Sequence, residues 1–123
     1  MTEIKFTINL PPITKKNHTQ FCRNKYTGKT FIIQAPAYRQ YEEDFMVVCP
    51  QLETIDFPVN VQAIYYMPTK RKVDLINLHA ALHDCLVKKR VLLDDNSSII
   101  VSTDGSRVFY DKENPRTEIT ISY

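Results

Sequence analysis

The chain has 123 residues, which is enough for one domain over residues 1–123 with a modest core and leaves little room for a second. Its 43% hydrophobic and 24% charged residues exclude wholesale disorder, and no apolar run is long enough to cross a membrane. The net charge is only +2, but the bases fall in two blocks, seven Lys and Arg in residues 1–40 and six in residues 67–93, which would form a phosphate-binding face if the fold brings them together.

The number and spacing of the cysteines indicate a cytoplasmic protein. Three cysteines lie far apart without CxxC spacing, which argues against a disulfide framework and a structural zinc site. The first six residues alternate polar and apolar side chains, so we expect no signal peptide.

The first half of the chain predicts a strand, a hairpin and a helix. Apolar residues alternate from Ile4 to Leu10, as in a half-buried strand, and Pro11-Pro12 ends it. Residues 21–33 predict a hairpin, with Phe21–Tyr26 and Thr30–Ile33 as strands and Thr27-Gly28 as the turn. A helix then begins at Pro36, with a buried stripe of Tyr38, Tyr41, Phe45 and Val48.

The second half predicts a strand over residues 57–67, a helix over residues 75–88 and three short strands. The helix has one apolar stripe, formed by Leu75, Leu78, Leu82 and Leu86. The short strands are residues 99–102, 107–110 and 117–123, with a turn at Asp104-Gly105. This order predicts an α+β fold in which two main helices pack on one face of a mixed β-sheet.

Acidic residues flank the second helix. Asp74 lies at its start beside three consecutive bases, Lys70, Arg71 and Lys72, and the pair Asp94-Asp95 follows its end. Clustered carboxylates suit Mg²⁺, which promotes phosphodiester cleavage. A helix of this length rises roughly 20 Å, so the acids meet only if the chain after the helix runs back along it.

Each of these features has an ordinary structural interpretation. Asp74 is a good helix N-cap, Asp94-Asp95-Asn96 is a common polar turn, and the basic triplet is typical of a solvated loop. His79 and His83 share a helical face at a spacing that binds zinc, but no third ligand is evident, so a polar helix face or a dimer contact is favoured. His18 lies in a basic loop, where a phosphate contact fits its surroundings.

The acidic residues recur at spacings seen in one nuclease family. The run from Asp74 to Asn77, then Asp84 and the pair Asp94-Asp95, resembles the DLDN and DD motifs of the RusA family of Holliday junction resolvases. The likeness covers nearly the whole chain, including the strand that leads through Pro-Pro to Lys15-Lys16-Asn17. The segments around Arg107 and Arg116 resemble a branch found among Gram-positive bacteria and their phages.

This resemblance implies a homodimeric endodeoxyribonuclease that resolves four-way DNA junctions with Mg²⁺, or with Mn²⁺ as a substitute. Asp74 and Asp95 match catalytic aspartates, and Asp94 joins them as a metal ligand. Phosphate-binding roles fall to Lys15, Lys16, Asn17, Lys70, Arg71 and Lys72, with Asn77 and Arg107 in support. Two positions depart from the family pattern, because Ile76 replaces its second aspartate and Ala80 replaces a catalytic lysine.

Three hypotheses follow from the sequence. The first is the Mg²⁺-dependent junction endonuclease, active in DNA recombination and repair. The second is a branched-DNA-binding protein of the same fold whose activity is weakened or lost with Ile76 and Ala80. The third is an interaction protein in which the aspartates only cap a helix and form a turn. At residue 76 we expect the isoleucine to pack under the helix or at a dimer contact.

Overall fold

The computed structural model describes residues 1–15, 19–34 and 36–123. Its centre is a five-stranded mixed sheet with strand order β1-β7-β4-β5, in which β6 pairs with β4 alongside β5. The strands of this sheet are β1 (Glu3–Ile8), β4 (Val59–Met67), β5 (Ile100–Ser102), β6 (Arg107–Tyr110) and β7 (Arg116–Ser122). The α+β prediction with a mixed sheet and two helices is therefore confirmed.

Strand direction in this sheet follows from its connections. β7 pairs antiparallel with both β1 and β4, whereas β5 and β6 run parallel to β4. The connection from β4 to β5 contains helix α2 (Leu75–Lys88), because two parallel neighbours need a long crossover. The start of β5 therefore lies beside Val59, at the opposite end of β4 from Met67.

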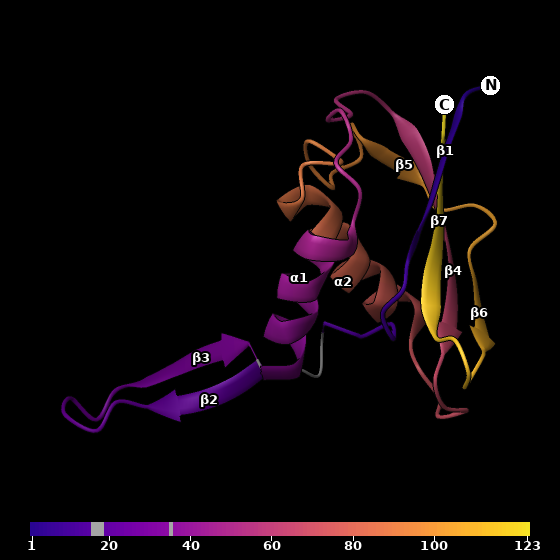
Figure 1. Cartoon of the computed structure of the whole chain (residues 1–123). Coiled ribbons are helices and arrows are strands. Elements are labelled where there is room, and N and C mark those ends of the chain that lie inside the picture. Colours follow the sequence, from indigo (N-terminus) through magenta and orange to yellow (C-terminus); the bar gives the residue numbers. More distant parts are fainter. Residues whose placement is uncertain (16–18, 35) are drawn as a thin grey trace.

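The two helices lie on the same side of the sheet in Figure 1. One cluster of buried residues contains side chains from α1 (Pro36–Val48), α2 and the inward-facing positions of the strands. The stripe residues Tyr38, Tyr41 and Phe45 are buried, as predicted. Val48 is exposed instead, because the helix ends there and Cys49 takes the inward position.

The apolar stripe of α2 is buried except at its first turn. Leu78, Leu82 and Leu86 belong to the core, and Leu75 is only partly buried. No helix in the described ranges is long and apolar enough to cross a membrane.

The predicted hairpin is β2 (Thr19–Arg23) and β3 (Thr30–Gln34), which extends away from the sheet and helices (Figure 1). The first strand ends earlier than predicted because the Asn24 side chain accepts hydrogen bonds from the backbone N–H groups of Tyr26 and Thr27. Gly105 also occupies its predicted turn. Its φ of 87° suits glycine, and an added Cβ would lie 2.9 Å from Gln62 Oε1.

Candidate functional site

A cleft of about 700 Å³ lies where β4 ends and α2 begins. One wall comes from the segment that follows β1, and the other from the loop between β4 and α2. The lining residues include Pro12, Ile13, Thr14, Met67, Thr69, Arg71, Lys72, Val73, Asp74 and Asn77. The backbone N–H of Lys15 donates to the Asn77 carbonyl at 3.4 Å, which joins the two walls.

Asp74 is the acidic residue in this cleft, and it caps α2. Its backbone is extended, and its Oδ1 accepts hydrogen bonds from the N–H groups of Ile76 at 2.8 Å and Asn77 at 3.4 Å. The N-cap interpretation is therefore confirmed. Capping occupies only Oδ1, at the positive end of the helix dipole. Oδ2 makes neither cap bond, so a metal-binding role is compatible with capping.

The basic triplet borders the same cleft. Lys70, Arg71 and Lys72 are exposed, and the last two line the cleft beside Asp74. Lys15 lies nearby, but its Nζ is 3.6 Å from Asp84 Oδ1, so part of its charge is neutralised within the chain. Lys16, Asn17 and His18 fall outside the described residues. The cleft thus combines one carboxylate with several cations, as expected of a site for a phosphodiester.

Asp94 and Asp95 lie in an exposed turn after α2. Asp94 Oδ1 accepts from the Asp95 backbone N–H at 2.7 Å, and its Oδ2 accepts from Asn96 Nδ2 at 2.9 Å. This geometry agrees with the polar-turn interpretation. It leaves the Asp95 carboxylate exposed to solvent and outside this pair of bonds.

The chain does not bring Asp74 together with the Asp94-Asp95 pair. α2 separates them by roughly 20 Å, and the segment after α2 turns into β5 at the start of β4 instead of running back toward Asp74. No group of three or more His, Cys, Asp or Glu side chains able to hold a metal occurs among the described residues. Within one chain, the described side chains therefore place only Asp74 of the three predicted metal ligands at the cleft.

His79, which is buried, and His83, which is partly buried, form a stacked pair on α2. Their rings stack at 5.3 Å with 7° between planes, and His79 Nδ1 lies 2.7 Å from the Tyr65 hydroxyl oxygen. Burial lowers the pKa of His79, and burial together with the neighbouring His79 lowers the pKa of His83 to about 4. Each Nε2 is buried without a hydrogen-bond partner in the described part of the chain. A fully exposed polar helix face is thus wrong for His79, which is buried, whereas a dimer contact at this pair stays a prediction.

The family comparison decides the assignment of the chain. The family model for endodeoxyribonuclease RusA matches residues 9–122, nearly the whole chain. The chain belongs to the RusA family. RusA proteins are endodeoxyribonucleases, so the cationic cleft around Asp74 belongs to a nuclease fold. No curated protein matches the chain.

The two departures from the RusA pattern share one surface of α2. Ile76 is 75% exposed, and Ala80, one helical turn later, is exposed too. The expectation that Ile76 packs under the helix is therefore wrong. Sequence reasoning also missed the Pro12–Thr14 wall of the cleft, although the Pro-Pro break before a basic segment marks that position.

Proposed function

We propose that this RusA-family protein is a Mg²⁺-dependent endonuclease that resolves four-way DNA junctions in recombination and repair. The observation that carries the proposal is Asp74, held by two backbone N–H groups at a cleft lined by Arg71 and Lys72. A fixed carboxylate beside cations suits metal-assisted cleavage of a phosphodiester. Mn²⁺ has the same preference for oxygen ligands and serves as the substitute ion.

The separation of the carboxylates supports a homodimer as the working unit. A twofold axis across the middle of α2 pairs two copies of the helix antiparallel, because such an axis reverses direction. The start of α2 in one protomer then lies near the end of α2 in the other. In this arrangement Asp74 faces Asp94 and Asp95 of the partner subunit, which gives two equivalent sites for the two cuts in a junction.

The exposed surface of α2 is suited to such pairing. Ile76 and Ala80 lie at i and i+4 on one helical face, and neither carries charge. An isoleucine that is 75% exposed gains burial only when another molecule covers it. A close contact between two copies of α2 at these positions therefore buries apolar surface without desolvating a charge.

Each residue then has a defined task. Asp74 and the partner's Asp95 are the catalytic carboxylates, and the partner's Asp94 completes the oxygen ligands. Bound Mg²⁺ supplies polarisation of the phosphoryl oxygen and a lower pKa for the attacking water. Arg71 and Lys72 hold the backbone phosphate at the mouth of the cleft, while Asn77 adds an amide to its wall.

Mixing two inactive variants tests the shared site. Asp74→Asn and Asp95→Asn should each abolish cleavage of a four-way junction when alone. After the two are unfolded and refolded together, half of the dimers are mixed, and each mixed dimer has one site with both aspartates intact. We expect nicking of one strand to return. Refolding each variant alone is the control, and absence of any recovered nicking in proven mixed dimers would refute the shared site.

The second candidate is a junction-binding protein without turnover. The observation that favours it is the loss of both family charges on α2, since Ile76 and Ala80 carry none. Binding to four-way and linear DNA is measured in EDTA, and cleavage is measured after addition of Mg²⁺. Preferential junction binding with no cleavage in Mg²⁺ or Mn²⁺ would support this candidate over the nuclease.

A further inference from the structure

Strand β6 exposes an unusual run of large apolar side chains. Val108, Phe109 and Tyr110 follow one another on this edge strand, with Phe109 48% and Tyr110 44% exposed. Because successive side chains of a strand point to opposite faces, Phe109 lies on one face of the sheet and Val108 and Tyr110 lie on the other. A large exposed ring on an edge strand favours association and is usually avoided unless it binds something. The tasks proposed for the cleft residues do not use this run.

Phe109 belongs to a row of three side chains that crosses the sheet. The strand register pairs Tyr66 with Phe109 on one side and with Arg116 on the other. The Tyr66 and Phe109 rings stack with centroids 5.6 Å apart, and the Arg116 guanidinium carbon lies 3.8 Å from the Tyr66 ring centroid. The row lies on the face opposite the helices, because the alternate residue Tyr65 points into the core.

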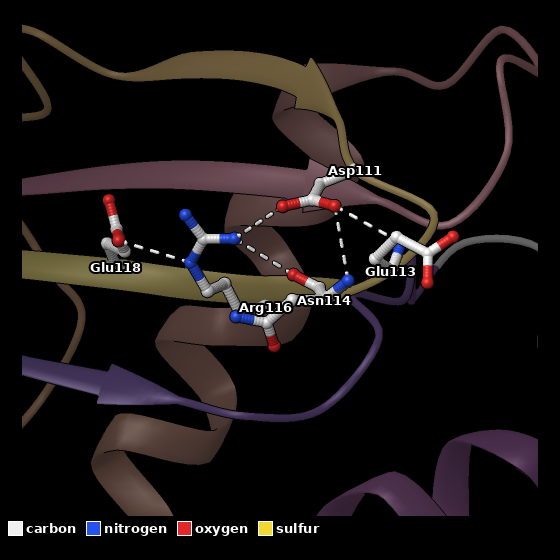
Figure 2. A network of polar contacts seen from close by, with 5 residues as sticks. All are labelled: Asp111, Glu113, Asn114, Arg116 and Glu118. Carbon is white, nitrogen blue, oxygen red and sulfur yellow. Dashed lines mark hydrogen bonds and ion pairs between the residues drawn. The ribbon is translucent and has the colours of Figure 1, made fainter.

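Arg116 is held too tightly to serve as a phosphate ligand. Its Nε donates to Glu118 at 3.1 Å, and its NH1 donates at 2.9 Å to both the Asp111 carboxylate and the Asn114 carbonyl. Figure 2 shows the guanidinium between the two carboxylates. The two carboxylates, Asp111 and Glu118, more than neutralise its charge, so its contribution is to fix Tyr66 and, through it, the Phe109 ring. These contacts position the aromatic pair.

Two cations, Arg107 and Lys70, lie at or beside β6. Lys70 Nζ lies 5.2 Å from the Tyr110 ring centroid, on the cleft side of the sheet and not on the face of Phe109. Arg107 is exposed on β6 itself, two residues before Phe109 and on the same side of the strand. Exposed aromatic rings on an open sheet face, combined with cations, are the chemistry that stacks nucleobases and holds their phosphates.

We propose that Phe109, stacked on Tyr66 and fixed by Arg116, is a platform for an unpaired nucleobase of the branched DNA, with Arg107 contacting a flanking phosphate. The inference rests on the proposed function, because it assumes a DNA substrate. It adds that the protein holds a base displaced at the branch point. Stacking accepts any base, so the platform contributes affinity for unpaired DNA without sequence preference.

Oligonucleotides with and without bases test the platform. Binding of the full chain to single-stranded oligothymidylate and to an abasic strand of equal length is measured by fluorescence anisotropy in EDTA. The wild type should prefer the strand with bases. Phe109→Ala should weaken that binding by roughly 5- to 150-fold and leave abasic binding almost unchanged. Phe109→Tyr keeps a ring and should retain the preference. Val101→Ala, at an exposed apolar position on β5, is the matched control and should change neither affinity.

Three results with Phe109→Ala would overturn the platform. The first is unchanged affinity for oligothymidylate, and the second is an equal loss of affinity for oligothymidylate and for the abasic strand when the melting temperature is normal. The third is a shift of the variant from dimer to monomer. The last result would assign the patch to a second copy of the chain. Junction cleavage by the wild type is assayed separately. Base-dependent binding without cleavage removes the nuclease proposal alone, whereas cleavage without base preference removes the platform alone.

Discussion

Replacing Ile76 with Asp tests the proposed dimer and the metal site in one variant. Ile76 is the second residue of α2 and is 75% exposed, so the change removes little buried surface within one protomer. An acidic side chain in the first helical turn gains about 0.3–1 kcal/mol from the helix dipole. The folded monomer should therefore be as stable as the wild type or slightly more stable.

The effect on the dimer should be large. Full burial of an isoleucine contributes about 1.5–3 kcal/mol, and a twofold interface contains two copies, so the loss is on the order of 3–6 kcal/mol. The dissociation constant of the dimer should rise about 10²- to 10⁴-fold. Sedimentation velocity over a concentration series measures this change, and thermal melting reports the stability of the chain.

A matched control is Val47→Asp, at an apolar position of α1 that is also highly exposed. This control should leave the dimer intact. An Ile76→Asp protein that dimerises like the wild type would refute the α2 interface. If that dimer also needed less Mg²⁺ for half-maximal cleavage, residue 76 would lie at the metal, in the role of the family's second aspartate.

Three further predictions concern the aspartates, the basic triplet and His83. Asp74→Asn and Asp95→Asn should each abolish cleavage and leave junction binding and the melting temperature nearly unchanged, because Asn caps a helix as well as Asp does. Cleavage by Asp95→Asn at the wild-type rate would contradict the proposed site. Replacing residues 70–72 with alanine should reduce the slope of log affinity against log salt by about 0.9 for each phosphate that the triplet neutralises. An unchanged slope would mean that the triplet is a solvated loop without phosphate contacts. The folded-state pKa of His83 is lowered to about 4, so the folded protein favours the neutral imidazole. The free energy of unfolding is therefore highest above about pH 6.5, where the unfolded state is also neutral, and it decreases as the pH falls toward 4. Between about pH 6.5 and 4, the unfolding free energy of the wild type should decrease more steeply than that of His83→Gln, by up to about 1.4 kcal/mol per pH unit. Parallel plots of unfolding free energy against pH for the two proteins would contradict a buried neutral imidazole.

Periodicity predicted the bounds of α2 correctly because the local signals agree there. Asp74 caps the start, the leucine stripe continues for four turns, and basic residues occupy the end. The error at Val48 has the opposite cause. Helical spacing extends the stripe of α1 to that residue, but the helix stops there and the chain turns toward Pro50. Helix ends depend on tertiary contacts that the spacing does not encode.

The distance between the acidic clusters was not predictable from spacing. It depends on the direction of β5 relative to β4, which is a property of the sheet and not of either strand. A parallel crossover returns the chain to the start of β4, whereas an antiparallel return would have placed Asp94 near Asp74. The contact between Lys15 and Asp84 was hidden for the same reason, since it joins segments far apart in the sequence.

The position of Ile76 connects the family departures to the proposed assembly. The second helical position favours an acidic residue, and an exposed isoleucine there forgoes that benefit. Such a residue is stabilising only if a partner covers it, and Ala80 beside it permits a close approach of two helices. In the proposed dimer, the residue that replaces a family carboxylate would bury apolar surface between the protomers, and Asp94 and Asp95 of the partner subunit would supply the missing oxygens. The proposal thus predicts that loss of a ligand and gain of an interface are two consequences of one substitution.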